Sequence, residues 1–316
     1  MSVIVVGSIN QDIISFVEQY PKKGDTIFGE KIEYFYGGKG ANQATTIARL
    51  RKKVYLISAV GDDSQGEEII ENLQKSNVNT DYIKMSTSKE TGTTIVTIDH
   101  TAENTMQVFK GANDDLTNKD VIKAMDSIMD SNILLVQMEI PQQSAITSMK
   151  TAKEKGVYVV LDPAPADGMI VEALKYADLI TPNQQETKHL VGIDVFDENS
   201  ALKAAKAFEE IGVNSSIIKM GSKGSLVYEN GSVMFIPPVK VNPVDTVGAG
   251  DAFAGAIAAG LSNGESLLNS AKFANIVAAI SITKFGAQTA IPTIDEVKKF
   301  IKEKNLQTVN CSFLNG

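Results

Sequence analysis

The chain has few of the residues that build metal centres and disulfide frameworks. Its 316 residues include one cysteine (Cys311), two histidines (His100 and His189) and no tryptophan. One cysteine cannot form a disulfide framework. With so few cysteines and histidines, a zinc site with the usual ligands is improbable.

The chain also lacks an excess of positive charge and any long apolar run. It contains 30 Lys and Arg residues and 38 Asp and Glu residues, which gives a formal net charge of −8. This balance argues against binding to a nucleic-acid backbone. No run reaches the roughly 18 apolar residues that span a membrane, and the start "MSVIVVGSINQD" has no signal-peptide pattern. We therefore expect no nucleic-acid or membrane partner and a cytoplasmic location.

Short β-branched runs separated by helical patterns are abundant. Most of these runs are apolar throughout, as is typical of strands buried on both faces. The alternation predicts a layered α/β/α fold with a mostly parallel sheet, in a single domain over residues 1–316. Towards the end we expect strands at 215–220, 225–229 and 233–236, and helices at 250–262, 265–284 and 293–304.

Two stretches, residues 12–36 and 91–110, interrupt this alternation. The first carries strand-like aromatics around Pro21 and Gly24, and the second reads as a hairpin. We interpret both as β insertions that form one small sheet over the edge of the main sheet.

The stretch "DTVGAGDAFAG" at 245–255 places almost bare backbone between two acids. Gly248 and Gly250 permit close approach of a ligand, and the helix that follows offers free first-turn amides, including that of Ala249, to an anion. Asp251 stands in this first turn, where we expect the helix dipole to lower its pKa, so that as a base it would act by position. The alternative is an acid that only complements the dipole.

A second glycine-rich stretch, "YGGKGANQA" at 36–44, precedes a helix predicted to start near Ala41. Lys39, Asn42 and Gln43 are donors suited to hydroxyls or a phosphate. A glycine-rich helix cap without further function explains the pattern equally well.

Polar residues follow several predicted strands. Asn10 and Asp12 follow the first strand, and Glu139 ends another buried strand in "LLVQMEIP" at 134–141. Ligands of open α/β sheets bind beyond the carboxyl ends of strands, although a strand-terminal acid is often only solvated. Asn183 and Glu186 lie three residues apart at a helix start, a spacing that a helix cap also satisfies.

The usual nucleotide-binding fingerprints are missing. A G-x-G-x-x-G motif needs a third small residue, but Gln43 and Phe253 stand there, and no G-x-x-x-x-G-K-[ST] motif occurs. Neither a dinucleotide dehydrogenase nor a P-loop NTPase is supported.

Taken together, these motifs resemble the ribokinase family of sugar and nucleoside kinases, also called the phosphofructokinase-B-like group. Both signatures, "GGKGANQA" and "DTVGAGDAF", are present. "GSIN-x-D", "PAPA", "TPN-x-x-E", "GSKG" and "GAQ" occur in the family's order. The resemblance covers nearly the whole chain.

The resemblance implies a layered core with a β-sheet lid, formed here by the two insertions, and a homodimer through paired lids. It implies ATP-dependent phosphorylation of D-ribose at the 5-hydroxyl, with Mg²⁺ and, as monovalent activator, K⁺. Asp251 would be the general base, and the amides of Gly248, Ala249 and Gly250 would stabilise the transferred phosphoryl group.

The other roles are carried over position by position. The implied sugar ligands are Asn10, Asp12, Gly38, Lys39, Asn42 and Glu139. The implied ATP site comprises Asn183, Lys219, Gly221, Ser222, Gly224 and Asn275. Glu186 would serve Mg²⁺ through water. Asp245, with backbone near Val247, Lys284 and Gly286, would hold K⁺.

The chain departs from the ribokinase pattern at two positions. Ala290 replaces a frequent serine near the K⁺ site, and Thr94 replaces a small apolar lid residue. A relative acting on another substrate (deoxyribose, a ketohexose, a keto-deoxy sugar acid or pseudouridine) is the first alternative. For a nucleoside, Phe35, Tyr36 and Phe109 are candidates to stack on the base. The second alternative is a non-catalytic sugar-binding protein of the same fold.

Overall fold

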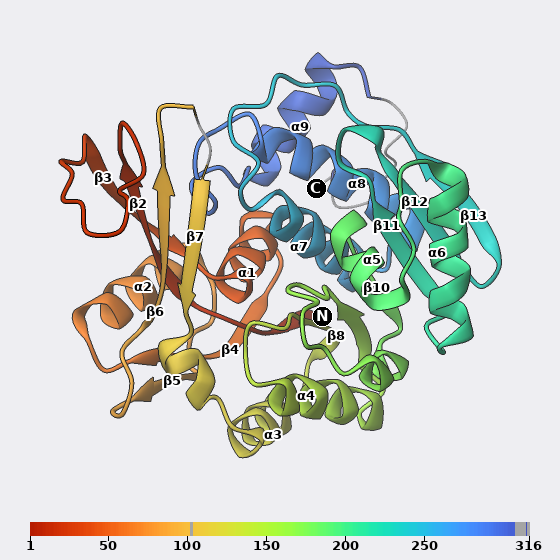
Figure 1. Cartoon of the computed structure of the whole chain (residues 1–316). Coiled ribbons are helices and arrows are strands. Elements are labelled where there is room, and N and C mark those ends of the chain that lie inside the picture. Colours follow the sequence, from red (N-terminus) through yellow and green to blue (C-terminus); the bar gives the residue numbers. More distant parts are fainter. Residues whose placement is uncertain (102–103, 307–313, 315–316) are drawn as a thin grey trace.

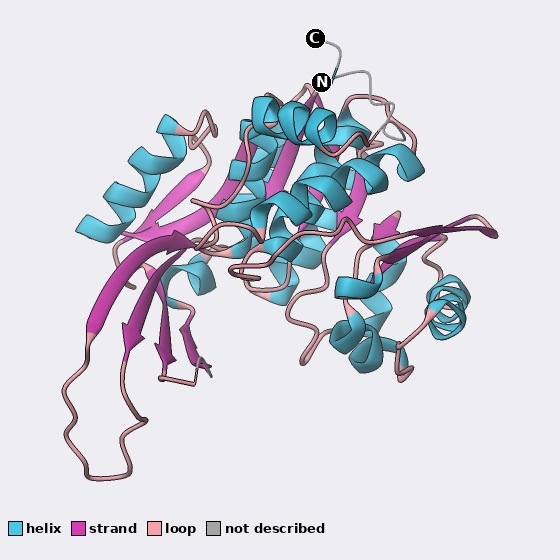
Figure 2. Cartoon of the chain, turned by 90° about the horizontal axis from the view of Figure 1, so that it is seen from above, coloured by secondary structure: helices cyan, strands magenta, loops and turns pink. Residues whose placement is uncertain are grey.

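The computed structural model describes residues 1–101, 104–306 and 314. Cys311 and residues 102–103 of the predicted hairpin lie outside the described residues. The chain forms a large sheet covered by helices on both faces and a small separate sheet that projects from one side (Figures 1 and 2).

The large sheet is parallel except at one edge. Its order is β13-β12-β11-β10-β9-β8-β1-β4-β5, and only β12 and β13 run antiparallel to their neighbours. The strands are β1 (Ser2–Val6), β4 (Val54–Gly61), β5 (Ile83–Ser86), β8 (Ser131–Val136), β9 (Tyr158–Leu161), β10 (Leu179–Ile180), β11 (Ser215–Lys219), β12 (Ser225–Glu229) and β13 (Ser232–Ile236).

Successive strand residues enter two different hydrophobic cores. In β1, Val3 and Val5 join the core on one face, and Ile4 and Val6 join the other, because side chains alternate along a strand. The first face is covered by α1 (Lys39–Arg49), α2 (Ser64–Lys75), α7 (Ala249–Ser262), α8 (Leu267–Ser281) and α9 (Ile294–Glu303). The second is covered by α3 (Asn118–Ser127), α4 (Gln142–Glu154), α5 (Gln184–Val191) and α6 (Glu198–Glu210).

The small sheet, which we call the lid, comprises β2 (Asn10–Phe16), β3 (Lys31–Gly37), β6 (Gly92–Ile98) and β7 (Asn104–Phe109). Its order is β3-β2-β6-β7, with β2 and β6 parallel and both outer pairs antiparallel. Figure 2 shows it leaving the layered body at one side. The two predicted insertions thus form one sheet.

The layered fold and the late helices agree with the expectations from the sequence. The helix predicted from near Ala41 begins at Lys39, and Asn10 already belongs to a lid strand. Strand β5 has no counterpart among the expected strands. The assignment of the whole chain to one domain stays a prediction. None of the helices in the described part of the chain has the length and hydropathy needed to cross a bilayer.

A close helix contact brings the two glycine-rich motifs together. A Cβ on Gly255 in α7 would lie 2.7 Å from Cβ of Thr46 and 2.9 Å from the carbonyl oxygen of Gln43, both in α1. Only glycine permits this approach. The contact sets the distance between the polar residues of α1 and Asp251, one turn earlier in α7.

We predict that Gly255→Ala lowers the free energy of unfolding by about 1–3 kcal/mol through overpacking, although alanine is the better helix former. Urea unfolding measures the change. Gly29→Ala is the control, because its Cβ would make an ordinary 3.5 Å contact with Phe16 O. Equal stability of Gly255→Ala and the wild type would contradict the close contact.

Candidate active site

The helices that carry the two signatures begin without side-chain caps. Gly38 precedes α1 with φ 86°, and Gly248 precedes α7 with φ 75°; neither helix has a side-chain cap. The helices α2, α3, α5, α6, α8 and α9 are capped by side chains, whereas α4, which follows Pro141, also has no side-chain cap. The first amides of α7 therefore keep donor capacity for a ligand, although Ala249 N donates weakly to Thr246 O at 3.3 Å. In α1, by comparison, Lys39 N donates to Glu139 Oε2 at 3.3 Å and Ala41 N donates to Ser8 O at 3.0 Å.

Asp251 is buried and is held by two amide side chains from α1. Asn42 Nδ2 donates to Oδ2 at 2.9 Å, and Gln43 Nε2 donates to Oδ1 at 3.1 Å. Burial raises the pKa of Asp251, although Lys39 opposes the shift. The expectation that the helix dipole lowers this pKa was therefore wrong, because desolvation outweighs it. Asn42 Oδ1 has no partner among the described residues and is buried.

A buried chain of hydrogen bonds extends from Asp251 into the centre of the sheet. Gln137 Nε2 donates to Gln43 Oε1 at 2.5 Å, and Gln43 Nε2 donates also to Asp162 Oδ2 at 2.9 Å. Lys219 Nζ pairs with Asp162 Oδ1 at 3.2 Å. The chain links the ends of α1, β8, β9 and β11 and holds Gln43 in one orientation.

Lys39 and Glu139 lie beside this chain. Glu139 Oε2 accepts from Ser8 Oγ at 2.5 Å and from Lys39 N at 3.3 Å. The negative charge of Asp251 has the largest effect on Lys39 and raises its pKa. Burial opposes this shift, and the charge of Glu139 adds to it. The ammonium group is thus held protonated among acids.

Asp12, in the lid, faces the same acidic site. Burial raises the pKa of Asp12 to about 6, with Glu139 and Asp251 adding to the shift and Thr94 opposing it. In the register of the lid, Asp12 stands between Phe35 and Thr94, so these three side chains share one face.

Asn113, in the short helical turn η1 (Gly111–Asp115), anchors the base of the lid. It exchanges hydrogen bonds with the backbone of Ile9 and donates from Nδ2 to Asn10 Oδ1 at 2.8 Å. Asn10 Nδ2 reaches Thr94 Oγ1 at 3.4 Å. A Cβ on Gly38 would lie 2.7 Å from Asn10 N, so this glycine lets the lid strand touch the start of α1.

Asn183 and Glu186 form a reciprocal helix cap. Glu186 N donates to Asn183 Oδ1 at 2.8 Å, and Asn183 donates from N and Nδ2 to the two Glu186 oxygens at 2.7 and 2.8 Å. This helix cap accounts for the three-residue spacing of Asn183 and Glu186, which is the alternative explanation that the sequence left open. Burial raises the pKa of Glu186 while Lys219 opposes the shift, so the cap lies within reach of the same charges.

Lys219 connects this cap to the start of α7. A Cβ on Gly250 would lie 3.7 Å from Lys219 Nζ, which places an ammonium group beside the uncapped amides. The residues that influence one another here are five acids, Asp12, Glu139, Asp162, Glu186 and Asp251, and two lysines, Lys39 and Lys219.

The remaining residues of the implied ATP site lie at two places, after β11 and after β13. Gly221, Ser222 and Gly224 form and follow the turn η3 (Gly221–Lys223) after β11, and Gly221 and Gly224 have φ 57° and 93°. Asn275 in α8 donates to Pro237 O at 2.8 Å, just after β13. No contact joins these residues directly to Asp251 in the described structure.

Asp245 ties together two loops in front of α7. Its Oδ1 accepts from Val247 N at 3.0 Å, and its Oδ2 accepts from Gly286 N at 2.9 Å. The Lys284 side chain instead pairs with Glu296 at 2.5 Å. Ala290 is buried.

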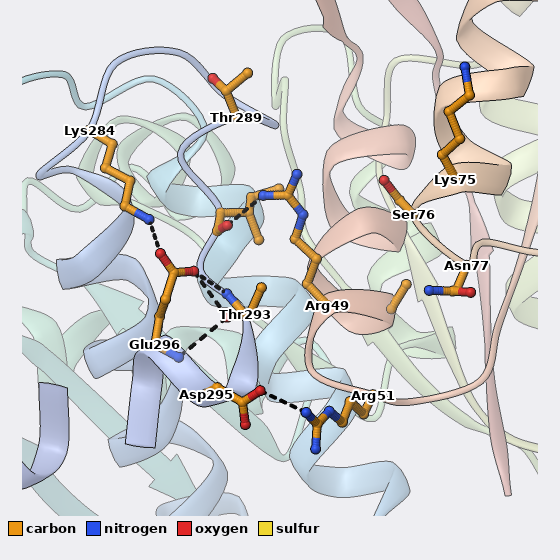
Figure 3. Close-up of a pocket in the computed structure, with 12 residues that line it drawn as sticks. Arg49, Arg51, Lys75, Ser76, Asn77, Lys284, Thr289, Thr293, Asp295 and Glu296 are labelled. Atoms are coloured by element: carbon orange, nitrogen blue, oxygen red, sulfur yellow. Dashed lines mark hydrogen bonds and ion pairs between the residues drawn. The ribbon is translucent and has the colours of Figure 1, made fainter. Parts of the chain in front are cut away.

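Lys284 also lines a hollow of about 580 Å³ behind this segment, shown in Figure 3. Arg51 pairs there with Asp295, and Arg49 donates to Ile291 O at 2.6 Å. Of the predicted site residues, only Lys284 lines this hollow. Within the described residues, no three of His, Cys, Asp and Glu cluster as a metal site would require.

The structure thus gathers the predicted sugar and catalytic residues around Asp251, with Lys219, Asn183 and Glu186 beside them. Sequence reasoning missed Asp162, Asn113 and Ser8 as members of the network. Asp162 had a usable signal, since "VYVVLDP" ends a buried strand on an acid. Asn113 had none, because its role depends on where the lid meets the body.

Comparisons with known proteins agree with this geometry. A model of the pfkB family carbohydrate kinases matches residues 1–294. A ribokinase from Haemophilus influenzae is 38% identical over 298 residues, covering 94% of this chain and 97% of the relative. A deoxyribokinase from Salmonella typhi is 31% identical over 304 residues, covering 95% and 99%. The solved ribokinase of Arabidopsis thaliana, complexed with ribose and ATP, has a TM-score of 0.88 at 30% identity and covers 95% and 98%.

The chain belongs to the pfkB family of carbohydrate kinases. It is a ribokinase-family sugar kinase, a phosphotransferase with an alcohol group as acceptor. The family resemblance stated from the motifs is therefore confirmed, and the non-catalytic alternative is not supported.

We predict that kcat/KM for the sugar falls as the pH drops through about 6. The raised pKa of Asp12 means that its carboxylate is charged above this pH and neutral below it, and the neutral form accepts hydroxyl hydrogen bonds less well. The pH profile of kcat/KM measures this effect.

Asp12→Asn should lower kcat/KM at neutral pH and remove the acid limb near pH 6. Asp167→Asn is the control, since the Asp167 side chain is 94% exposed. An acid limb that persists unchanged in Asp12→Asn would assign it to another carboxyl group.

Proposed function

We propose that the chain transfers the γ-phosphoryl group of ATP to the 5-hydroxyl of D-ribose, giving ribose 5-phosphate and ADP. The observation that carries this proposal is the position of Asp251. It is a buried carboxylate with a raised pKa, in the first turn of an uncapped helix, oriented by Asn42 and Gln43.

In the proposed reaction the 5-oxygen of the sugar attacks the γ-phosphorus while Asp251 accepts the hydroxyl proton. The bond from the γ-phosphorus to the bridging oxygen breaks, and ADP leaves with that electron pair. The raised pKa of Asp251 favours proton uptake. Amides of Gly248, Ala249 and Gly250, with Lys219 beside them, would stabilise charge on the transferred group.

Asn10, Asp12, Gly38, Lys39, Asn42 and Glu139 are the proposed sugar-binding residues. The buried Asn42 Oδ1 without a partner among the described residues supports this assignment, because a sugar hydroxyl would satisfy it. Carboxylates and amides together suit vicinal hydroxyls, each of which can donate and accept.

Mg²⁺ is the proposed divalent partner of ATP. Five acids against two lysines leave an excess of negative charge where a polyphosphate must bind, and a divalent cation offsets it. Both Glu186 oxygens already accept hydrogen bonds from Asn183, so Glu186 would serve the ion through water. When bound, Mg²⁺ neutralises charge on the phosphates.

We place ATP along Asn183, Lys219, Gly221, Ser222, Gly224 and Asn275, as the family motif implies. K⁺ remains a proposal for Asp245, with backbone near Val247, Lys284 and Gly286. Asp245 oxygens keep further acceptor capacity beyond their two amide bonds. Ala290 supplies no hydroxyl there, which weakens this site.

The strand register of the lid helps to decide between a free sugar and a nucleoside as substrate. Of the three aromatic residues proposed to stack on a nucleoside base, Tyr36 is opposite Gln11 and Phe109 is opposite Thr93, so both lie on the face away from Asp12. Phe35 alone shares the Asp12 face. This arrangement favours a free sugar over a nucleoside. Deoxyribose remains the alternative, since Thr94 flanks Asp12.

We propose that two copies of the chain pair through their lids. Both outer lid strands are edges in the described structure. Ile32, Tyr34 and Phe109 are more than half exposed on the lid face opposite Asp12. Exposed apolar edge strands are usually covered by a partner. The predicted cytoplasmic location also stays a prediction.

A substrate panel tests the proposed function. ADP release from ATP·Mg²⁺ is measured with D-ribose, 2-deoxyribose, fructose and nucleosides, and phosphorus NMR identifies the product. We expect kcat/KM to be largest for D-ribose, with the phosphate on C5. A larger kcat/KM for 2-deoxyribose would contradict the sugar assignment and leave the kinase assignment standing.

The same assay in K⁺ and in Na⁺, with the wild type and with Asp245→Ala, tests the monovalent site. We expect any K⁺ activation to be lost in Asp245→Ala. An identical K⁺ titration of the two proteins would contradict the assignment of Asp245.

A further inference from the structure

The segment between α8 and α9, residues 282–293, which we call the α8–α9 loop, contacts several parts of the molecule. At its front, Gly286 N donates to Asp245 Oδ2 at 2.9 Å. The next residue, Ala287, lies against the start of α7, since a Cβ on Gly248 would be 3.1 Å from the Ala287 Cα. The front of the loop thus borders the proposed phosphoryl-binding amides.

The rear of the loop is fixed to the body. Arg49 of α1 donates to Ile291 O at 2.6 Å, and Asn72 of α2 donates to Gln288 Oε1 at 3.0 Å. Figure 3 shows Arg49 reaching this rear side while Lys284 turns towards Glu296. The loop is thus fixed to α2 at residue 288 and to α1 at residue 291.

The tip of the loop touches the lid. The rings of Phe285 and Phe35 meet edge to face, with centroids 5.7 Å apart and planes at 66°. Phe35 also covers Gly286, where a Cβ would lie 3.5 Å from the ring. Phe35 stands opposite Asp12 in the β2–β3 ladder, so a ligand that moves Asp12 moves Phe35 with it.

We propose that Phe285 is a positioning residue that couples sugar occupancy of the lid to the loop bordering Asp245 and Gly248. The inference rests on the proposed function, because it takes Asp12 as a sugar ligand. The route runs from Asp12 through Phe35 to Phe285, and from there along two peptide units to Gly286 and Ala287. Each step is a covalent bond, a strand pair or a ring contact.

The lid has the local geometry for such a movement. Its strands join the body at Gly37, Gly92 and Gly111, the last with φ 50°, and residues of this kind absorb the dihedral changes of a hinge. Phe285 is 42% exposed, so its ring can follow the lid without disturbing a core. Sugar binding and nucleotide binding then favour each other by the same factor.

The absence of tryptophan provides a direct probe of the contact. Phe285→Trp introduces a single tryptophan at the lid contact. Ribose should change its emission with a half-saturation equal to the calorimetric Kd of ribose. Phe196→Trp is the matched control, since Phe196 is 60% exposed just before α6, and its emission should not respond. Unchanged emission of Phe285→Trp at saturating ribose would overturn the inference.

The coupling itself is measured by calorimetry with a non-hydrolysable ATP analogue, with and without saturating ribose. In the wild type we expect ribose to tighten analogue binding about 5-fold or more. In Phe285→Ala the ratio should fall to about 1, while Kd for each ligand alone stays close to the wild-type value. Phe285→Tyr keeps the ring contact and should restore the ratio. If Phe285→Ala fails to fold, Phe35→Leu interrupts the same contact.

The two proposals fail differently. An active ribose kinase whose ribose–nucleotide coupling is equal in the wild type and Phe285→Ala, or absent from the wild type, contradicts this inference alone. A chain that binds ribose with a change in Phe285→Trp emission but does not phosphorylate it contradicts the proposed function alone.

Discussion

The site depends on one buried carboxylate whose two oxygens are both held by amide groups of another helix. Asp251 accepts from Asn42 and Gln43, and Gln43 is itself oriented by Gln137 and Asp162. Burying the charge of Asp251 without hydrogen-bond partners would cost free energy. The close contact of α1 and α7 at Gly255 and the hydrogen-bond chain therefore depend on each other. The close approach of α1 and α7 brings the donors to the acid, and the donors make the burial of that acid tolerable.

The excess of acids around this carboxylate explains several other features. Burial and neighbouring charges raise the pKa of Asp12 and Asp251. The acids around Lys39 raise its pKa and keep it protonated, although burial opposes this shift. A site of this kind attracts hydroxyl donors and cations more readily than a bare polyphosphate. The uncapped start of α7 and Lys219 provide the complementary region for phosphate.

Much of the fold followed from local patterns, because apolar runs, glycines and helix starts act within a few residues. The lid insertions and the late helices were expected within a few residues of where they lie. Asn183 and Glu186 show where sequence patterns stop being informative about function. Their spacing forms a helix cap whether or not a cation binds nearby. Asp162 ends a buried strand and so had a local signal, but its hydrogen bond with Gln43, 119 residues away, could not be predicted. Asn113 could not be placed, because the lid residues that it holds, Ile9 and Asn10, lie more than 100 residues away. The pKa of Asp251 was misjudged because burial is a tertiary property.

The most direct test of the account is single-turnover phosphoryl transfer in Asp251→Asn. Asp251→Ala is the second variant, because the NH₂ group of an asparagine would face one of the two donors, Asn42 Nδ2 or Gln43 Nε2. If Asp251 is the base, the transfer rate should fall by about 10²–10⁴, while calorimetry gives Kd values for ribose and an ATP analogue close to the wild-type values. A transfer rate within tenfold of the wild type in both folded variants would contradict the central role of Asp251.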